Sequence, residues 1–249
     1  MNRPAYYAML SAPETLDYER YLSTASLLAC QKPFDVLCNA DELQFQIVHQ
    51  VEELWMKLIA STLLDIDDYL QAGDARRVVT LFGRCNTLIK LMTEQMGLLE
   101  TMSPKEYQQI RLQLGNGSGQ ESPGFRVLVH MPPELWASYA TRYLTGGRTV
   151  RDIYDHQYTH DDAYVVAEAM IEFDERFQKF RALHMFLILR SIGIGSKSLK
   201  GRPIELLQAG LRQRFFPVLW DVRGEMTDAW GASYGVVRDS LDATEQAAE

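Results

Sequence analysis

Two histidines in long apolar stretches are the first candidates for chemistry. His49 follows Phe45 by four residues, and His184 stands in a row of apolar positions where leucine is expected. Residues four apart share one face of a helix, so each histidine is predicted on, or at the edge of, a core-forming face. A buried imidazole needs partners for both nitrogens, and a metal is one such partner. Each histidine therefore has two interpretations, a satisfied core residue or a group directed into a pocket.

The other three histidines are weaker candidates. His156 and His160 are four residues apart and could bind a metal if helical, but their segment is short and polar, which favours a solvated face. His130 precedes Met-Pro-Pro and is predicted in a loop. No glutamate stands three residues before any histidine, which argues against a ferritin-like di-iron site. The Cys-x-x-Cys-His motif of covalently attached haem is also absent.

Two helices that each carry a histidine could enclose a flat apolar cofactor. One histidine would be the axial ligand, and the other would face the open side. Haem fits this arrangement, because its iron takes one proximal histidine and leaves a distal position for oxygen. The periodicity suggests this arrangement.

The elements that must position these residues are predicted to be helices. Apolar residues recur with a helical period on each side of His49 and of His184, and no stretch shows sustained alternation. Ser103-Pro104-Lys-Glu106 is a clear helix start, with a serine cap and a proline in the first turn. The predicted helices cover residues 42–70, 75–102, 104–114, 163–192 and 204–224, with a break at Pro217, and a short helix follows a cap at Thr15.

The remaining segments are predicted as connections. Residues 1–15 form an arm without a core pattern, Met131-Pro-Pro133 breaks a mixed region over residues 125–150, and residues 238–249 are a polar tail that frays. The glycine-rich segment 115–124 matches neither a Walker loop nor a dinucleotide fingerprint, so it is either a flexible connection or a loop that covers a ligand. The sequence therefore predicts one all-α domain over residues 1–249.

Composition excludes several classes of function. The formal net charge of −8 leaves no basic surplus to neutralise nucleic-acid phosphates. The three cysteines, Cys30, Cys38 and Cys85, lack zinc spacing and are expected as reduced thiols. The first residues are too polar for a signal peptide, and no apolar run approaches the roughly 18 residues that span a bilayer. A cytoplasmic protein that binds neither nucleic acid nor membrane is expected.

Several motifs together resemble one family. Phe45-x3-His49-Gln-x2-Glu53-Leu-Trp-x-Lys57 resembles the distal signature of the tryptophan 2,3-dioxygenase family. The match covers about residues 16–125 and 173–224 in one collinear order. The supporting motifs are Tyr18-x2-Tyr21-Leu22, Thr93-Glu-Gln-x3-Leu-Glu100-Thr, Ser103-Pro-x-Glu-Tyr107-x3-Arg111, Arg181-x2-His184-Met185 with Ile192-Gly193, and Phe215-Phe216-Pro217-x-Leu-Trp-x-Val-Arg223.

The resemblance implies a helical-bundle haem oxygenase with haem b, O2 as co-substrate and L-tryptophan or a substituted tryptophan as substrate. It implies that His184 is the proximal iron ligand and that His49 hydrogen-bonds the indole nitrogen. It also implies a homo-oligomer, a tetramer or a dimer, whose N-terminal segment reaches into a neighbouring subunit's pocket. The other implied residues are Phe45, Tyr21 and Leu22 at the indole with Tyr18 nearby, Arg111 and Tyr107 at the carboxylate, Ser198 at the amino-acid end, and Ser118 and Gly119 at the haem.

The sequence departs from the family pattern at two loops. The family's Gly-Thr-Gly-Gly loop reads Lys197-Ser198-Leu199-Lys200 here, and the segment after Arg111 is longer than usual. The region between the two matching blocks is also shorter than in typical members of the family. Both loops would cover the polar end of the substrate, so the substrate could be a β-substituted tryptophan. Three outcomes stay open: cleavage of the C2–C3 bond to an N-formylkynurenine, insertion of one oxygen to give a 2-oxindole, or a non-catalytic haem carrier.

Overall fold

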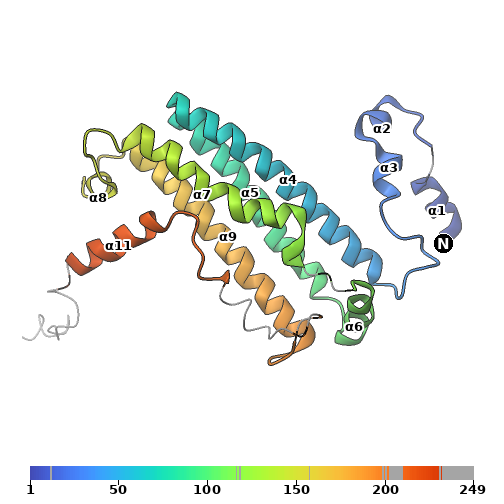
Figure 1. Ribbon diagram of the computed structural model, residues 1–249. Coiled ribbons are helices and arrows are strands. Elements are labelled where there is room, and N and C mark those ends of the chain that lie inside the picture. Colours follow the sequence, from blue (N-terminus) through green and yellow to red (C-terminus); the bar gives the residue numbers. More distant parts are fainter. Residues whose placement is uncertain are drawn as a thin grey trace, which may run out of the picture.

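Four long helices lie side by side in the protein (Figure 1). They are α4 (Glu42–Ala72), α5 (Ala75–Leu99), α7 (Pro123–Tyr143) and α9 (Asp162–Ile192). α4 packs against α5 and α7, and α5 also packs against α9. The computed structural model describes residues 1–11, 13–115, 117, 119–156, 158–197, 199, 201, 210–229 and 231. No β-strand occurs among these residues, so the prediction of an all-α fold is confirmed.

Shorter helices surround the bundle. α8 lies at one end of the bundle and α6 at the other, while α11 lies beside α8 and α9 (Figure 1). The predicted helix over residues 204–224 lies partly outside the described residues, and its break at Pro217 is the point where α11 begins. The short helices are α1 (Arg3–Leu10), α2 (Asp17–Leu22), α3 (Thr24–Leu28), α6 (Pro104–Gln113), η1 (Gly119–Glu121), α8 (Val150–Tyr154) and α11 (Pro217–Ala229).

The core forms because the periodic apolar residues of the long helices face one another. Phe82 of α5 and Phe173 of α9 are fully buried, with ring centroids 5.7 Å apart. Burying one large apolar side chain stabilises a fold by roughly 1.5–3 kcal/mol. Other fully buried members of this core are Ile59, Leu63, Ile66, Leu70, Leu81, Ile89 and Phe177.

Local signals end and restart the helices, and one of the two predicted caps is correct. Gly73 ends α4 with φ of 77°, a left-handed conformation that favours glycine, and the Asp74 side chain then accepts a hydrogen bond from the Arg77 backbone N–H of α5. Ser103 caps α6 by accepting from the Glu106 backbone N–H. Thr15 is not a cap, because the Glu19 carboxylate reaches back and accepts the backbone N–H groups that open α2.

The predicted break at Met131-Pro-Pro133 is wrong. α7 runs without interruption through Pro132 and Pro133, and it also contains His130, which was predicted in a loop. Each proline removes one backbone donor and crowds the preceding turn. Pro132 is buried, and Leu128 and Leu135 on α7 are buried core residues. Tertiary packing along α4 therefore outweighs the local preference of the two prolines.

The N-terminal arm contributes no buried residue. No described residue before Glu42 is buried, and α1–α3 lie apart from the four long helices in Figure 1. Residues 3–10 are helical, although the sequence suggested an arm without a periodic pattern. Several large apolar side chains on this arm are exposed, among them Met9, Leu16, Tyr18 and Tyr21. The predicted tail over residues 238–249 lies outside the described residues.

Asp174 fixes α11 against α9. Its carboxylate is fully buried and accepts hydrogen bonds from the backbone N–H groups of Phe215 and Phe216, at 2.8 and 3.1 Å. It also accepts from Nε1 of Trp220 at 2.9 Å. A buried carboxylate of this kind needs such donors, because an unpaired buried charge is strongly unfavourable.

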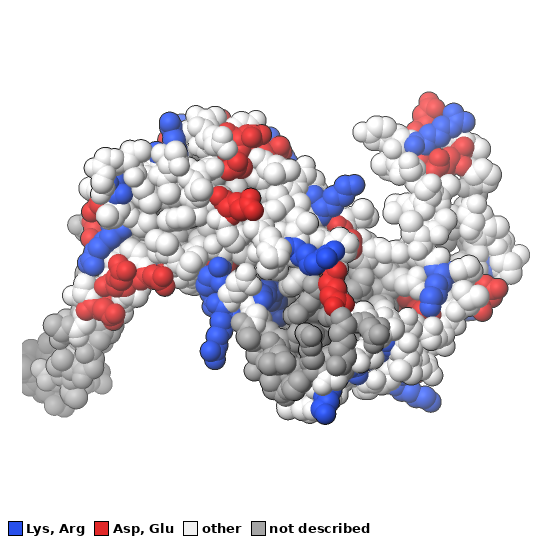
Figure 2. Space-filling model, viewed as in Figure 1, with Lys and Arg blue, Asp and Glu red and all other residues white. Residues whose placement is uncertain are grey.

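Positive and negative side chains are interspersed over the face of the molecule seen in Figure 2. Several of these charged side chains form ion pairs within one helix, such as Arg176 with Glu172 and Lys179 with Glu175 of α9. Within the described ranges, no helix is both long and apolar enough to cross a membrane.

Candidate functional site

His49 and His184 line one cavity of about 250 Å³. It is lined by residues from the first part of α4 and the last part of α9, with η1 and the start of α7 as further walls. The two histidines, which are distant in the sequence, are thus brought together as the haem hypothesis requires. The lining residues are His49, Gln50, Glu52, Glu53 and Met56 of α4, Gly119 of η1, Ser122, Pro123 and Phe125 at the start of α7, and Phe180 and His184 of α9.

His49 is held by its own helix. Its Nδ1 lies 2.7 Å from the Phe45 carbonyl oxygen. A carbonyl only accepts, so Nδ1 donates its hydrogen and Nε2 is left as an acceptor. The Phe45 ring lies 4.1 Å from the imidazole, between ring centroids. Burial lowers the pKa of His49, and the Phe45 carbonyl and the Glu53 charge oppose the shift, so the neutral form prevails at neutral pH.

His184 is the more strongly perturbed of the two imidazoles. Burial, with a smaller contribution from the charge of His49, lowers its pKa to about 4. The ring lies parallel to that of Phe180, with an interplanar angle of 9° and centroids 6.4 Å apart. No hydrogen bond joins its ring nitrogens to another residue in the described part of the chain. A neutral imidazole of this kind has a lone pair available for a metal ion.

The other walls suit a flat apolar group. Met56, Phe125 and Phe180 supply apolar surface around the histidines. A side chain at Gly119 would place its Cβ 3.9 Å from Cε1 of His184, so this glycine leaves room beside the imidazole. One neutral histidine with apolar walls matches the way in which proteins hold haem. The residues present therefore fit this cofactor.

Gly124 and Glu53 close one side of the cavity. The Gly124 backbone N–H donates to Oε2 of Glu53 at 2.9 Å, which joins the start of α7 to α4. A Cβ at Gly124 would lie 2.7 Å from Cβ of Met56, a distance that real side chains do not adopt. Only glycine lets the two helices approach this closely.

Glu52 introduces a second carboxyl group into the cavity, one turn after His49. Burial raises its pKa to about 7; the nearby Glu53 charge also raises it, while the side chain of Gln95 on α5 lowers it. The sequence motifs gave Glu52 no role. The missed signal was an ionisable residue three positions after a pocket histidine.

The predicted carboxylate-binding residues lie next to this cavity, not on its walls. The ring of Tyr107 on α6 is 6.4 Å from that of Phe45, between centroids. Burial raises the pKa of Tyr107, so its hydroxyl stays protonated, although the charge of Arg111 opposes the shift. Nη2 of Arg111 donates to the backbone carbonyl of Lys197 at 2.6 Å, which links α6 to the loop after α9.

Tyr18, Tyr21 and Leu22 are not brought to this cavity within one chain. Tyr18, Tyr21 and Leu22 lie on α2 in the arm, where Tyr21 is 87% exposed. Ser118 and Ser198 lie outside the described residues. His156 and His160 follow the end of α8 and are exposed, and the His160 ring stacks on Tyr164 at 4.1 Å between centroids.

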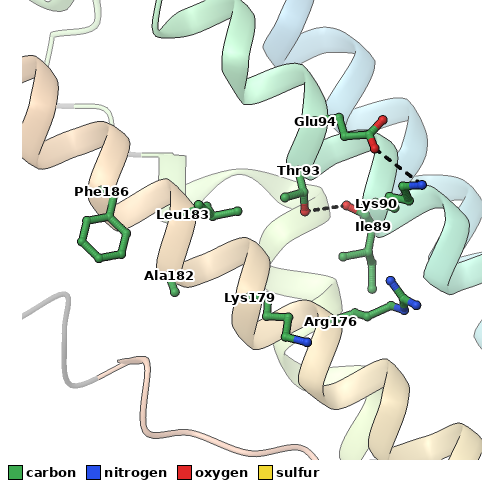
Figure 3. Close-up of a pocket in the computed structure, with 9 residues that line it drawn as sticks. All are labelled: Ile89, Lys90, Thr93, Glu94, Arg176, Lys179, Ala182, Leu183 and Phe186. Carbon is green, nitrogen blue, oxygen red and sulfur yellow. Dashed lines mark hydrogen bonds and ion pairs between the residues drawn. The ribbon is translucent and has the colours of Figure 1, made fainter.

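A larger cavity, of about 390 Å³, lies elsewhere on the bundle between α5 and α9 (Figure 3). It contains no histidine, and its lining residues include Ile89 and Leu183. Lys90 at its edge pairs with Glu94 at 3.6 Å. This cavity carries none of the candidate chemistry, so the smaller histidine cavity is the candidate site despite its size.

Comparison with known proteins agrees with this geometry. The family model for tryptophan 2,3-dioxygenase matches residues 7–143, which include His49 and Arg111. The tryptophan 2,3-dioxygenase of Myxococcus xanthus is 30% identical over 84% of this chain and 89% of its own length. The enzymes of that name from Serratia proteamaculans and Rhodococcus jostii are 26% and 28% identical, over 85% and 86% of this chain and 93% of each relative. The chain therefore belongs to the tryptophan 2,3-dioxygenase family, a family of haem-dependent oxidoreductases.

Proposed function

We propose that this protein uses haem b and O2 to oxidise the indole ring of L-tryptophan or a β-substituted tryptophan, by dioxygenation of C2–C3 to an N-formylkynurenine. The observation that carries the proposal is the pair of neutral histidines that line one cavity, His49 from α4 and His184 from α9. The names of the relatives support the reaction and the substrate class.

His184 is the residue that would hold the haem iron. Its low pKa leaves the imidazole unprotonated at neutral pH, and the cavity wall of Met56, Phe125 and Phe180 would exclude water from the cofactor. Gly119 would sit beside the ligand, and Ser118 next to it in the sequence is proposed as a further haem contact. When bound, haem supplies the redox-active iron that allows O2 to react with the indole.

His49 would orient the indole. Because Nδ1 donates to the Phe45 carbonyl, Nε2 can accept a hydrogen bond from the indole N–H. The Phe45 ring beside the imidazole would supply apolar surface for the indole. The helix fixes both side chains before the substrate arrives, which reduces the entropic cost of orienting the reacting groups.

Arg111 would bind the substrate carboxylate. One of its amino groups donates to the Lys197 carbonyl, and the remaining N–H groups of its planar fork can pair with a carboxylate. Tyr107, kept protonated by burial, would support this end of the substrate. Ser198, one residue after Lys197, is proposed to contact the amino-acid group.

The arm is proposed to complete the site of another subunit. Tyr18, Tyr21 and Leu22 are exposed on α2, and exposed apolar residues gathered on one segment indicate an interaction surface. In a homo-oligomer, a tetramer or a dimer, this segment would cover the indole pocket of a neighbouring copy. The chain is otherwise proposed to act as one domain in the cytoplasm.

The proposal is tested with haem-loaded protein, L-tryptophan and O2. The expected result is a change in the haem absorption spectrum on adding L-tryptophan, followed by a product that carries two added oxygen atoms. A product with one added oxygen atom would replace ring cleavage by 2-oxindole formation. If no indole compound changes the spectrum and none is oxidised, the protein is a haem carrier and the proposal is wrong.

A further inference from the structure

Glu52 is a carboxyl group on the wall of an otherwise largely apolar cavity. It lies on the face of α4 that carries His49, and its side chain lines the cavity together with His184. The neighbouring carboxylate, Glu53, is already used to fix the Gly124 backbone. Among the described residues, no backbone group is seen to donate a hydrogen bond to Glu52. The Glu52 side chain instead faces Gln95 on α5. The fold therefore tolerates this carboxyl group without an evident structural use.

The surroundings of Glu52 allow its carboxyl group to gain or lose a proton near neutral pH. Nε2 of Gln95 is buried and makes no hydrogen bond of normal geometry within the described ranges. Burial raises the pKa of Glu52 to about 7, so protonated and ionised forms coexist near neutral pH. The titratable groups that line the cavity beside it are His49 and Glu53 on α4 and His184 on α9. The other lining residues are uncharged, and α5 presents Gln95 to Glu52. Glu121 of η1 is exposed and is not among the lining residues.

We propose that Glu52 couples reduction of the bound haem to proton uptake. This inference rests on the proposed function, because it requires haem in the cavity between His49 and His184. Oxidised haem iron carries one more positive charge than reduced iron, and an ionised Glu52 stabilises the oxidised state. If a one-electron reductant reduced the iron, the ionised Glu52 would lose a favourable interaction with the positive charge. Its affinity for protons would then rise, and the carboxylate would take up a proton from solvent, which would offset part of the change in charge.

The expected size of the coupling follows from electrostatics. Two unit charges about 10 Å apart, at an effective dielectric constant of about 20, change an equilibrium constant on the order of tenfold. For one electron, a tenfold change corresponds to about 59 mV in midpoint potential. The potential should therefore fall by an amount of this order as the pH rises through 7.

The test is a spectroelectrochemical titration of the haem-loaded protein at a series of pH values on both sides of 7. Wild type is expected to show the fall in potential, and Glu52→Gln is expected to abolish it while keeping the shape of the side chain. Haem propionates and His49 also titrate, but both remain in the variant, so the difference between the two curves isolates Glu52. Glu94→Gln is the matched control, because its exposed charge is screened by solvent, and it should behave as wild type.

A second variant guards against misfolding of the first. Gln95→Leu removes the amide that lowers the pKa of Glu52, so the inflection is expected at higher pH than in wild type. A merely structural role for Glu52 would not move this inflection. Superimposable curves for wild type and Glu52→Gln would overturn the inference while the haem band still supports the proposed function. Absence of any haem band in wild type would overturn both.

Discussion

At the scale of single residues, the site depends on how burial sets protonation. His49 and His184 share one cavity, and burial lowers the pKa of both, whereas burial raises the pKa of Glu52 in the same space. Each shift favours the uncharged form, as desolvation requires. The sequence could indicate both histidines from their helical positions and from the family motifs. It could not indicate the role of Glu52, because the same residue on a solvated helix face would be unremarkable.

Replacing His184 by alanine is expected to abolish haem retention. The side chain is the only strong metal donor on its wall of the cavity among the described lining residues. The measurement is the haem absorption of purified protein after supplementation with haem, with circular dichroism to verify the fold. His160→Ala, on an exposed residue, should bind haem normally. Normal haem retention by the His184 variant would contradict the assignment.

The affinity for the indole substrate should depend on pH through His49. Only the neutral imidazole leaves Nε2 as an acceptor, and its pKa in the folded protein lies below the ordinary value of about 6.5. KM is therefore expected to stay constant as the pH falls to the lowered pKa of His49, and to rise only in more acidic solution. In His49→Ala, the plot of KM against pH should lack this rise in acidic solution. A rise in wild-type KM that begins above pH 6.5, about the ordinary value, and is absent in the variant would contradict the assignment.

At the scale of elements, the sequence predicted the long helices well and the connections less well. The bounds of α4, α6 and α9 agree with the predictions because periodic apolar residues, caps and glycines act locally. The α7 region was missed because two prolines suggest a break, while packing on α4 decides the outcome. The close contact at Gly124 was also missed, since a required glycine is visible only when the facing helix is known.

Gly124→Ala is expected to destabilise the fold by about 1–3 kcal/mol, because its Cβ would overlap with Met56 and overpacking costs about this much. The control is Gly83→Ala on α5, where a Cβ meets nothing within 4 Å. That change should stabilise the helix by about 0.5–1 kcal/mol. Denaturant unfolding measures both. Equal effects of the two substitutions would refute the close packing of α7 on α4.

At the scale of the whole molecule, we propose that one chain forms only part of the site. The cavity, Phe45, Tyr107 and Arg111 belong to the bundle, whereas Tyr18, Tyr21 and Leu22 lie on an exposed arm. The sequence predicted an arm over residues 1–15 from its lack of a core pattern, and a short helix after Thr15. Where this segment would dock in the proposed oligomer could not be derived from periodicity, since docking would depend on a surface of another copy.

Two inactive variants should restore activity when they are co-expressed. Arg111→Ala removes the carboxylate contact of the bundle, and Tyr21→Ala removes an apolar contact of the arm. If arms act in neighbouring subunits, mixed oligomers contain some sites with both residues intact, and turnover should exceed that of either variant alone. Tyr21→Ala should keep the wild-type melting temperature, because its side chain is exposed. Activity no higher than in the separate variants would show that arms do not act in trans.

The central claim is most directly tested by the fate of isotopically labelled O2 in the reaction with L-tryptophan. Haem-loaded wild-type protein is expected to place two labelled oxygen atoms in one ring-opened product, as mass spectrometry would show. His184→Ala should give no such product. A product with one labelled atom and an intact ring, or no labelled product at all, would contradict the account of this protein as a dioxygenase of the tryptophan indole.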